Sequence, residues 1–163
     1  MFSYDIQALA RRVVEEGAAR GLTVVCAESC TGGLVAAAIT AVAGSSAVLD
    51  RSFVTYSNAA KTQMLNVPAE VIEAQGAVSE AVARAMAEGA VRNAGADVAV
   101  AVTGVAGPGG GSEHKPVGLV HFAAAGPAGV VHVEHRFGDI GRDAVRLESV
   151  RTALGLLLDR MGA

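Results

Sequence analysis

The sequence predicts an α/β protein, a three-layer α/β/α sandwich around a mixed sheet of about five strands. Short apolar stretches alternate with amphipathic stretches that repeat apolar residues at helical spacing. The stretch 97–103 alternates Val and Ala, which is typical of a central strand covered on both faces. Two later strand-like stretches are separated only by Gly126-Pro127-Ala128-Gly129, which favours an antiparallel hairpin at one side of the sheet.

The first third of the chain predicts a helix, a strand, a second helix and a second strand. Apolar residues recur at helical spacing over 4–20, and Gly21 supplies a stop signal. The apolar run 22–27 predicts a short buried strand, and the Ala-rich run 33–42 predicts the next helix. The β-branched and aromatic residues over 51–56 predict the second strand.

The middle of the chain predicts three helices followed by the central strand. Ser57 and Ser79 are suitable N-caps, and Pro68 is favoured at a helix start. The predicted helices cover 59–65, 68–74 and 80–93.

The last third predicts a glycine-dense loop, the hairpin and a final amphipathic helix. These elements cover 104–116, the strands 117–124 and 130–137, and the helix 142–159. We expect one domain over 1–163, because this length is enough to bury one sizeable core.

The composition argues against membrane and nucleic-acid binding. Hydrophobic residues make up 52% of the chain. No run reaches the roughly 18–20 uncharged apolar residues of a membrane-spanning helix. The charged residues Asp5, Arg11 and Glu15 near the N-terminus are unlike a signal peptide. The net charge of −3 argues against a general polyanion-binding surface. We therefore expect a cytoplasmic protein.

The cysteines and histidines do not predict a metal site. Cys26 and Cys30 lack the CxxC spacing, so we expect two reduced thiols, with Cys26 in the core. The four histidines all follow residue 113, and no Cys or paired carboxylate completes a ligand set. We expect neither a metal nor an organic cofactor.

The segment 24–33 is the strongest candidate for a functional site. An apolar run leads into small polar residues, and Gly32-Gly33 then opens a helical segment. In open α/β folds, ligands bind at the carboxyl ends of strands, often beside helix N-termini that favour anions. Ser29 lies in this turn and is the candidate nucleophile.

The base for this serine is expected to be Lys61. The GxSxG pattern is absent, and the histidines lie in the glycine loop and hairpin, which disfavours a Ser-His-Asp triad. Lys61 lies just past the second predicted strand, near the same sheet edge. A desolvated lysine can accept a serine proton, and Tyr56 could orient that proton.

Three plainer interpretations stay open at this point. Ser29 and Thr31 could only cap the following helix. Lys61 could be a solvated surface charge. Cys30, rather than Ser29, could be the nucleophile.

The glycine-dense loop suggests an anion-binding region, although a flexible turn fits its residues equally well. Its backbone N–H groups can approach a phosphate closely, but it matches neither a Walker A loop nor GxGxxG. Lys115 at its end, with Arg142 and Arg146 one helical turn apart, could add positive charge.

Several segments together resemble the CinA C-terminal domain family, whose stand-alone bacterial members are called PncC. The resemblance covers roughly residues 5–160. The matching segments are AESCTGG at 27–33, GSS at 44–46, FVTYSN at 53–58 followed by Lys61, GAVS at 76–79, TGVAGP at 103–108, and GSE with KPVG over 111–118.

The resemblance implies amide hydrolysis of nicotinamide mononucleotide to nicotinic acid mononucleotide and ammonia. It implies catalytic roles for Ser29, Lys61 and Tyr56, without a metal or cofactor. It also suggests a homodimer and, since no second domain is visible in this sequence, the stand-alone enzyme. The substrate-binding residues expected on this basis are Cys30, Thr31, Gly32, Gly33, Ser46, Thr103, Gly104, Ala106, Gly107, Lys115 and Arg142.

A second function class stays open beside the enzyme. Longer family members are connected with competence and DNA damage, so a nucleotide-binding or protein-interaction module without turnover would keep the same fold. Retention of Ser29, Tyr56 and Lys61 favours the enzyme, because a pure binder has no need of a nucleophile and a base.

Overall fold

Five strands form one mixed sheet in the computed structural model, which describes residues 1–162. The strand order across the sheet is β2-β1-β3-β4-β5. The parallel strands are β2 (Leu49–Val54), β1 (Val24–Glu28) and β3 (Val98–Gly104). The antiparallel hairpin consists of β4 (Leu119–Gly126) and β5 (Gly129–Arg136), and β4 pairs with β3. The predicted mixed sheet and hairpin are confirmed.

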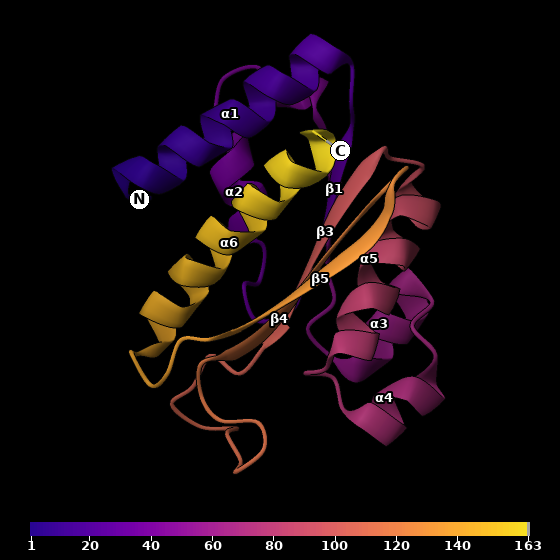
Figure 1. The fold of residues 1–163 in the computed structure, drawn as a ribbon, viewed down its shortest axis with the longest axis vertical. Coiled ribbons are helices and arrows are strands. Elements are labelled where there is room, and N and C mark those ends of the chain that lie inside the picture. The colour runs from indigo at the N-terminus through magenta and orange to yellow at the C-terminus, as the bar shows by residue number, and fades with distance from the viewer. Residues whose placement is uncertain (163) are drawn as a thin grey trace.

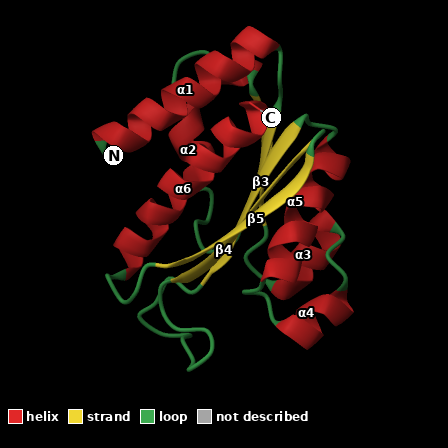
Figure 2. Cartoon of the chain, in the orientation of Figure 1, coloured by secondary structure: helices red, strands yellow, loops and turns green. Residues whose placement is uncertain are grey.

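Helices cover both faces of the sheet, so the molecule has three layers, as predicted (Figures 1 and 2). One face carries α1, α2 and α6, and the other carries α3, α4 and α5. The helix bounds are Tyr4–Arg20 for α1, Leu34–Thr40 for α2, Asn58–Leu65 for α3, Ala69–Gln75 for α4, Glu80–Ala94 for α5 and Arg142–Gly162 for α6, with a short 3₁₀ turn, η1, at Ser45–Ala47.

The alternation of Val and Ala along β3 decides how closely each helical layer packs. Val98, Val100 and Val102 pack in the core beneath α1, α2 and α6. Ala99 and Ala101 face the other layer, where small side chains let α5 lie close to the sheet. This strand is buried along nearly its whole length, as its apolar pattern predicts.

Gly89 brings α5 close to the end of α3. A Cβ at this position would lie 1.9 Å from the backbone oxygen of Leu65, so no larger residue fits without movement. The close crossing holds α3, which carries Lys61, against the rest of the α5 layer.

Two predicted caps define the helices on this face. The Ser57 hydroxyl accepts a hydrogen bond from the N–H of Ala60 at 3.0 Å and begins α3. The Ser79 hydroxyl accepts one from the N–H of Val82 at 3.3 Å and begins α5. Each bond satisfies an N–H group that a helix start otherwise leaves without a partner.

Strand β2 differs from the prediction, because it lies two residues earlier than 51–56. Its last residue in register with β1 is Val54, and the N–H of Thr55 then donates to the carbonyl of Glu28 at 2.9 Å. The next residues leave the sheet and cap α3. The shift places Thr55 and Tyr56 in the loop at the carboxyl ends of the parallel strands.

Within residues 1–162, no helix is both long and apolar enough to cross a membrane. The same residues contain no group of three His, Cys, Asp or Glu side chains arranged to hold a metal ion. His121 and His132 contact each other, with Nδ1 and Nε2 2.9 Å apart. Neither histidine lines the pocket described below.

Candidate active site

A pocket of about 300 Å³ lies at the carboxyl ends of β1 and β3. Its volume is at the lower end of the range of small-molecule sites, and its position is the usual one in α/β sheets. The loop after β3, which projects from one end of the sheet in Figure 1, forms one wall. The lining residues are Ser29, Cys30, Tyr56, Asn58, Lys61, Ala77, Val78, Thr103, Gly104, Val105, Ala106, Gly107, Gly109, Gly110 and Arg142.

Ser29 and Lys61 meet in this pocket. The Nζ atom of Lys61 lies 3.0 Å from Oγ of Ser29 and 2.8 Å from the carbonyl oxygen of Thr55. Lys61 is only 1% exposed, so the interpretation of this residue as a solvated surface charge is wrong. A hydroxyl in hydrogen-bond contact with a desolvated amine is the arrangement that activates a serine nucleophile.

The surroundings of Lys61 favour its neutral form. Burial lowers the pKa of Lys61 from its usual 10.5, and the nearby Cys30 opposes this shift. A neutral amine fits the two contacts: one N–H donates to Thr55, and the lone pair accepts the Ser29 hydroxyl proton.

Cys30 is poorly suited to be the nucleophile. Its side chain packs in the core beneath α1, α2 and α6, and the residue is 6% exposed. Burial raises the pKa of Cys30 to about 12, so the thiol is protonated near neutral pH. Cys26 is fully buried in β1, as predicted. Of the two candidate nucleophiles, Ser29 therefore has the better environment.

Glu28, which the sequence reasoning missed, holds the start of α2. Its buried carboxylate accepts hydrogen bonds from the N–H groups of Val35 at 2.9 Å and Ala36 at 3.1 Å, and from the Ser52 hydroxyl at 3.0 Å. A carboxylate at a helix N-terminus is favoured by the helix dipole. The sequence did contain a signal for this role: a carboxylate at the end of a predicted buried strand, directly before a predicted helix.

The hydrogen bonds from the first turn of α2 to Glu28 also argue against the interpretation that Ser29 and Thr31 only cap this helix. The residue at the N-cap is Gly33, which makes no side-chain cap bond, and Glu28 bonds to the first turn instead. The Thr31 hydroxyl is buried without a hydrogen-bond partner in residues 1–162. Ser29 is thus free for its contact with Lys61.

Arg142 connects two walls of the pocket. Its guanidinium donates to the carbonyl of Gly107 at 2.7 Å and to the hydroxyl of Tyr56 at 3.0 Å. In the described part of the chain, no hydrogen bond joins that hydroxyl to Ser29 or Lys61. The structure thus pairs Tyr56 with Arg142, whereas the sequence reasoning placed it beside the serine proton.

Thr103 fixes a further wall. Its hydroxyl donates to the carbonyl of Ala77 at 2.9 Å and thereby ties the end of β3 to the segment before α5. Ala77, Val78 and Asn58 line the pocket, although the sequence reasoning gave them no role. Their contribution depends on how α3 and α5 pack, which local patterns do not reveal.

Five of the predicted binding residues do not line the pocket. Ser46 lies in η1 before β2, at the opposite end of the parallel strands from Ser29, so the structure does not bring it to this site. Lys115 donates from Nζ to the carbonyl of Gln75 at the end of α4. The other three are the turn residues Thr31, Gly32 and Gly33.

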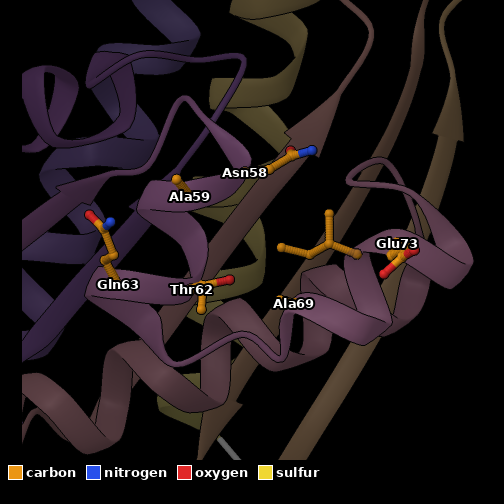
Figure 3. A pocket seen from close by; sticks show the side chains of 7 residues that line it. Asn58, Ala59, Thr62, Gln63, Ala69 and Glu73 are labelled. Carbon is orange, nitrogen blue, oxygen red and sulfur yellow. The ribbon is translucent and has the colours of Figure 1, made fainter.

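A second pocket, of about 430 Å³, lies between α3 and α4 (Figure 3). It shares Asn58 with the first pocket. Its lining residues are Asn58, Ala59, Thr62, Gln63, Ala69, Ile72 and Glu73.

The fold and the first pocket define a class: α/β proteins with a small-molecule pocket at the carboxyl edge of a mixed sheet and a buried serine–lysine contact inside it. The sequence pattern of the CinA C-terminal domain matches residues 6–161. The chain belongs to the CinA C-terminal domain family.

Three proteins similar to this chain show how it relates to other members of the family. A CinA-like protein from Synechococcus sp. (strain RCC307) is 55% identical over 96% of this chain, which spans 38% of that protein's length. The nicotinamide-nucleotide amidohydrolase PncC of Enterobacter agglomerans is 57% identical, with 86% of this chain and 90% of that protein covered. The crystal structure of the competence/damage inducible protein CihA from Agrobacterium tumefaciens is 54% identical over all of this chain and 99% of its own, with a TM-score of 0.97.

Proposed function

We propose that this protein hydrolyses the carboxamide of nicotinamide mononucleotide and releases nicotinic acid mononucleotide and ammonia. The observation that carries the proposal is the buried 3.0 Å contact between Nζ of Lys61 and Oγ of Ser29 at this pocket. The likeness to the Enterobacter agglomerans amidohydrolase, over most of both chains, supports the same reaction.

In the proposed reaction, Oγ of Ser29 attacks the carboxamide carbon while its proton passes to Nζ of Lys61. The carbonyl electron pair moves onto oxygen, where backbone N–H groups of the turn stabilise the oxyanion. When the oxyanion collapses, the carbon–nitrogen bond breaks and Lys61 returns the proton to the departing ammonia. The acyl group is then an ester of Ser29.

Water completes the cycle. Lys61, neutral again, accepts a proton from water as its oxygen attacks the ester carbon. The bond to Ser29 breaks, the serine oxygen recovers the proton from Lys61, and the carboxylic acid product loses its own proton to solvent. The net reaction consumes one amide and one water and yields one acid and one ammonia.

The cationic side of the pocket suits a phosphate. Arg142 contributes a guanidinium, and Gly109 and Gly110 leave the backbone open to close approach. Among the described residues, no Asp or Glu lines the pocket to repel an anion. We therefore place the substrate phosphate beside Arg142 and the glycine loop, with the carboxamide at Ser29.

The test is ammonia release by the purified protein from nicotinamide mononucleotide and, in parallel, from nicotinamide, which lacks the ribose phosphate. We expect turnover of the nucleotide and little or none of the free amide. Arg142→Ala should raise KM for the nucleotide about 10–100-fold with a smaller effect on kcat, because it removes a charge-assisted contact. A folded protein that binds the nucleotide without releasing ammonia would instead be a binding module.

A further inference from the structure

In the turn after Ser29, the carbonyls of Ser29, Cys30 and Thr31 all accept hydrogen bonds, whereas two N–H groups have no acceptor in the described part of the chain. The carbonyl of Ser29 accepts from the N–H of Gly32 at 3.0 Å, and that of Thr31 accepts from the N–H of Leu34 at 3.0 Å. The N–H groups of Cys30 and Thr31 donate to no acceptor in residues 1–162. Free N–H groups beside a nucleophile are the donors that an oxyanion requires.

Arg146 of α6 donates to two carbonyls of this turn. Its Nε donates to the carbonyl of Cys30 at 3.1 Å, and its Nη2 donates to the carbonyl of Thr31 at 3.2 Å. The two contacts use the planar fork of one guanidinium on two successive carbonyls, a geometry that a lysine cannot reproduce. The guanidinium comes from a helix more than a hundred residues away in the sequence.

These contacts determine where the free N–H groups point. A trans peptide is planar, so its N–H points away from its carbonyl. The hydrogen bond from Arg146 to the Cys30 carbonyl therefore fixes the direction of the Thr31 N–H, which belongs to the same peptide. The hydrogen bond from Arg146 to the Thr31 carbonyl likewise orients the Gly32 N–H. This N–H donates to the carbonyl of Ser29, and that contact fixes the direction of the Cys30 N–H in the same peptide as the Ser29 carbonyl.

The charge of Arg146 also favours negative charge at this turn. Although burial raises the pKa of Cys30 to about 12, the Arg146 guanidinium acts in the opposite direction and favours the anionic thiol. An oxyanion held by the neighbouring N–H groups would experience the same field. A fixed charge and fixed dipoles need no reorganisation when the oxyanion forms.

We propose that Arg146 is a positioning residue that holds the turn so that the N–H group of Cys30, which lines the pocket, binds the oxyanion. The inference rests on the proposed amide hydrolysis. Arg142, one helical turn earlier, lines the pocket, whereas Arg146 does not. Arg142 therefore acts on substrate binding, and Arg146 acts through the backbone on the chemical step.

The test compares Arg146→Gln with Arg151→Gln, an equivalent change on the same helix. Arg151 pairs with Asp5 and Glu148 and lies outside the pocket. We expect Arg146→Gln to lower kcat about 10²-fold with KM nearly unchanged, because a small misplacement of catalytic groups has a cost of that size. Arg151→Gln should leave both constants at the wild-type level.

A second measurement separates positioning from general damage to the fold. The aldehyde analogue of the substrate forms a tetrahedral adduct with a serine, so its affinity reports stabilisation of the oxyanion. Arg146→Gln should weaken this analogue by the same factor as kcat/KM. If the glutamine variant does not fold, Arg146→Lys takes its place, with an expected kcat loss of about tenfold through the lost fork.

The possible failures are distinguishable. Wild-type turnover with an unchanged kcat in Arg146→Gln, or equal losses of substrate and aldehyde affinity, would overturn the role of Arg146 and leave the amidohydrolase standing. Absence of turnover by the folded wild-type protein would overturn both.

Discussion

Replacement of Lys61 by methionine removes the proposed base while keeping an unbranched side chain in the buried site. The change deletes the amine that lies 3.0 Å from Oγ of Ser29 and 2.8 Å from the Thr55 carbonyl. A general base contributes about 10²–10⁴-fold, and Lys61 serves both acylation and deacylation in this scheme. We expect kcat to fall about 10³-fold, equivalent to about 4 kcal/mol of barrier.

The pH dependence of kcat/KM tests the same role of Lys61 as the base. Lys61 can accept a proton only when neutral, so kcat/KM should rise with pH up to the pKa of Lys61 and then level off. Burial lowers that pKa, so the midpoint should lie below 10.5. The assay is ammonia release from nicotinamide mononucleotide across this range, with each variant's fold checked by circular dichroism.

The chain contains one other lysine, Lys115, which provides a matched control. It lies outside the pocket lining, so Lys115→Met should keep the wild-type rate and the wild-type midpoint. A pH profile whose rising limb survives in Lys61→Met, or a wild-type rate that does not change with pH, would refute Lys61 as the base.

The remaining predictions concern stability and the second candidate nucleophile. At pH values between the lowered pKa of folded Lys61 and 10.5, the unfolded chain binds a proton that the folded chain lacks. The unfolding free energy of the wild type should therefore rise with pH in this range relative to that of Lys61→Met. Denaturant titrations at several pH values measure this difference. Because the pKa of Cys30 is raised to about 12, Cys30→Ala should keep ammonia release within about threefold, and iodoacetamide should not inactivate the protein at neutral pH. Gly89→Ala places a Cβ 1.9 Å from the Leu65 oxygen and should lower the unfolding free energy by about 1–3 kcal/mol. Gly155→Ala, with nothing within 4 Å, should raise it by about 0.5–1 kcal/mol in thermal or denaturant unfolding.

Local sequence patterns were sufficient to predict the elements of this fold. Helical spacing predicted α1, the capping serines predicted the starts of α3 and α5, and the Val and Ala alternation predicted a central strand. The position of β2 was predicted less accurately, because its end depends on the contact between Thr55 and Glu28. That contact joins two strands and has no local signature.

In the candidate site, too, local patterns predicted some features, whereas others depend on how distant elements pack. The positions of Ser29 and Lys61 after adjacent parallel strands were enough to predict that they share one sheet edge. The role of Arg146 depends on how α6 crosses the sheet, and helical periodicity alone does not define that crossing. Ser46 was placed with the site although it precedes β2, and a parallel strand begins at the edge opposite the site.

The most direct test of Ser29 as the nucleophile is a comparison of Ser29→Ala with the wild-type protein on nicotinamide mononucleotide. Ammonia release and nucleotide affinity by calorimetry are measured on the same preparations. We expect the variant to bind the nucleotide about as tightly as the wild type, because Arg142 and the glycine loop are unchanged, yet to release no ammonia above background. Wild-type turnover in Ser29→Ala would contradict this expectation, since the reaction would then proceed without the serine.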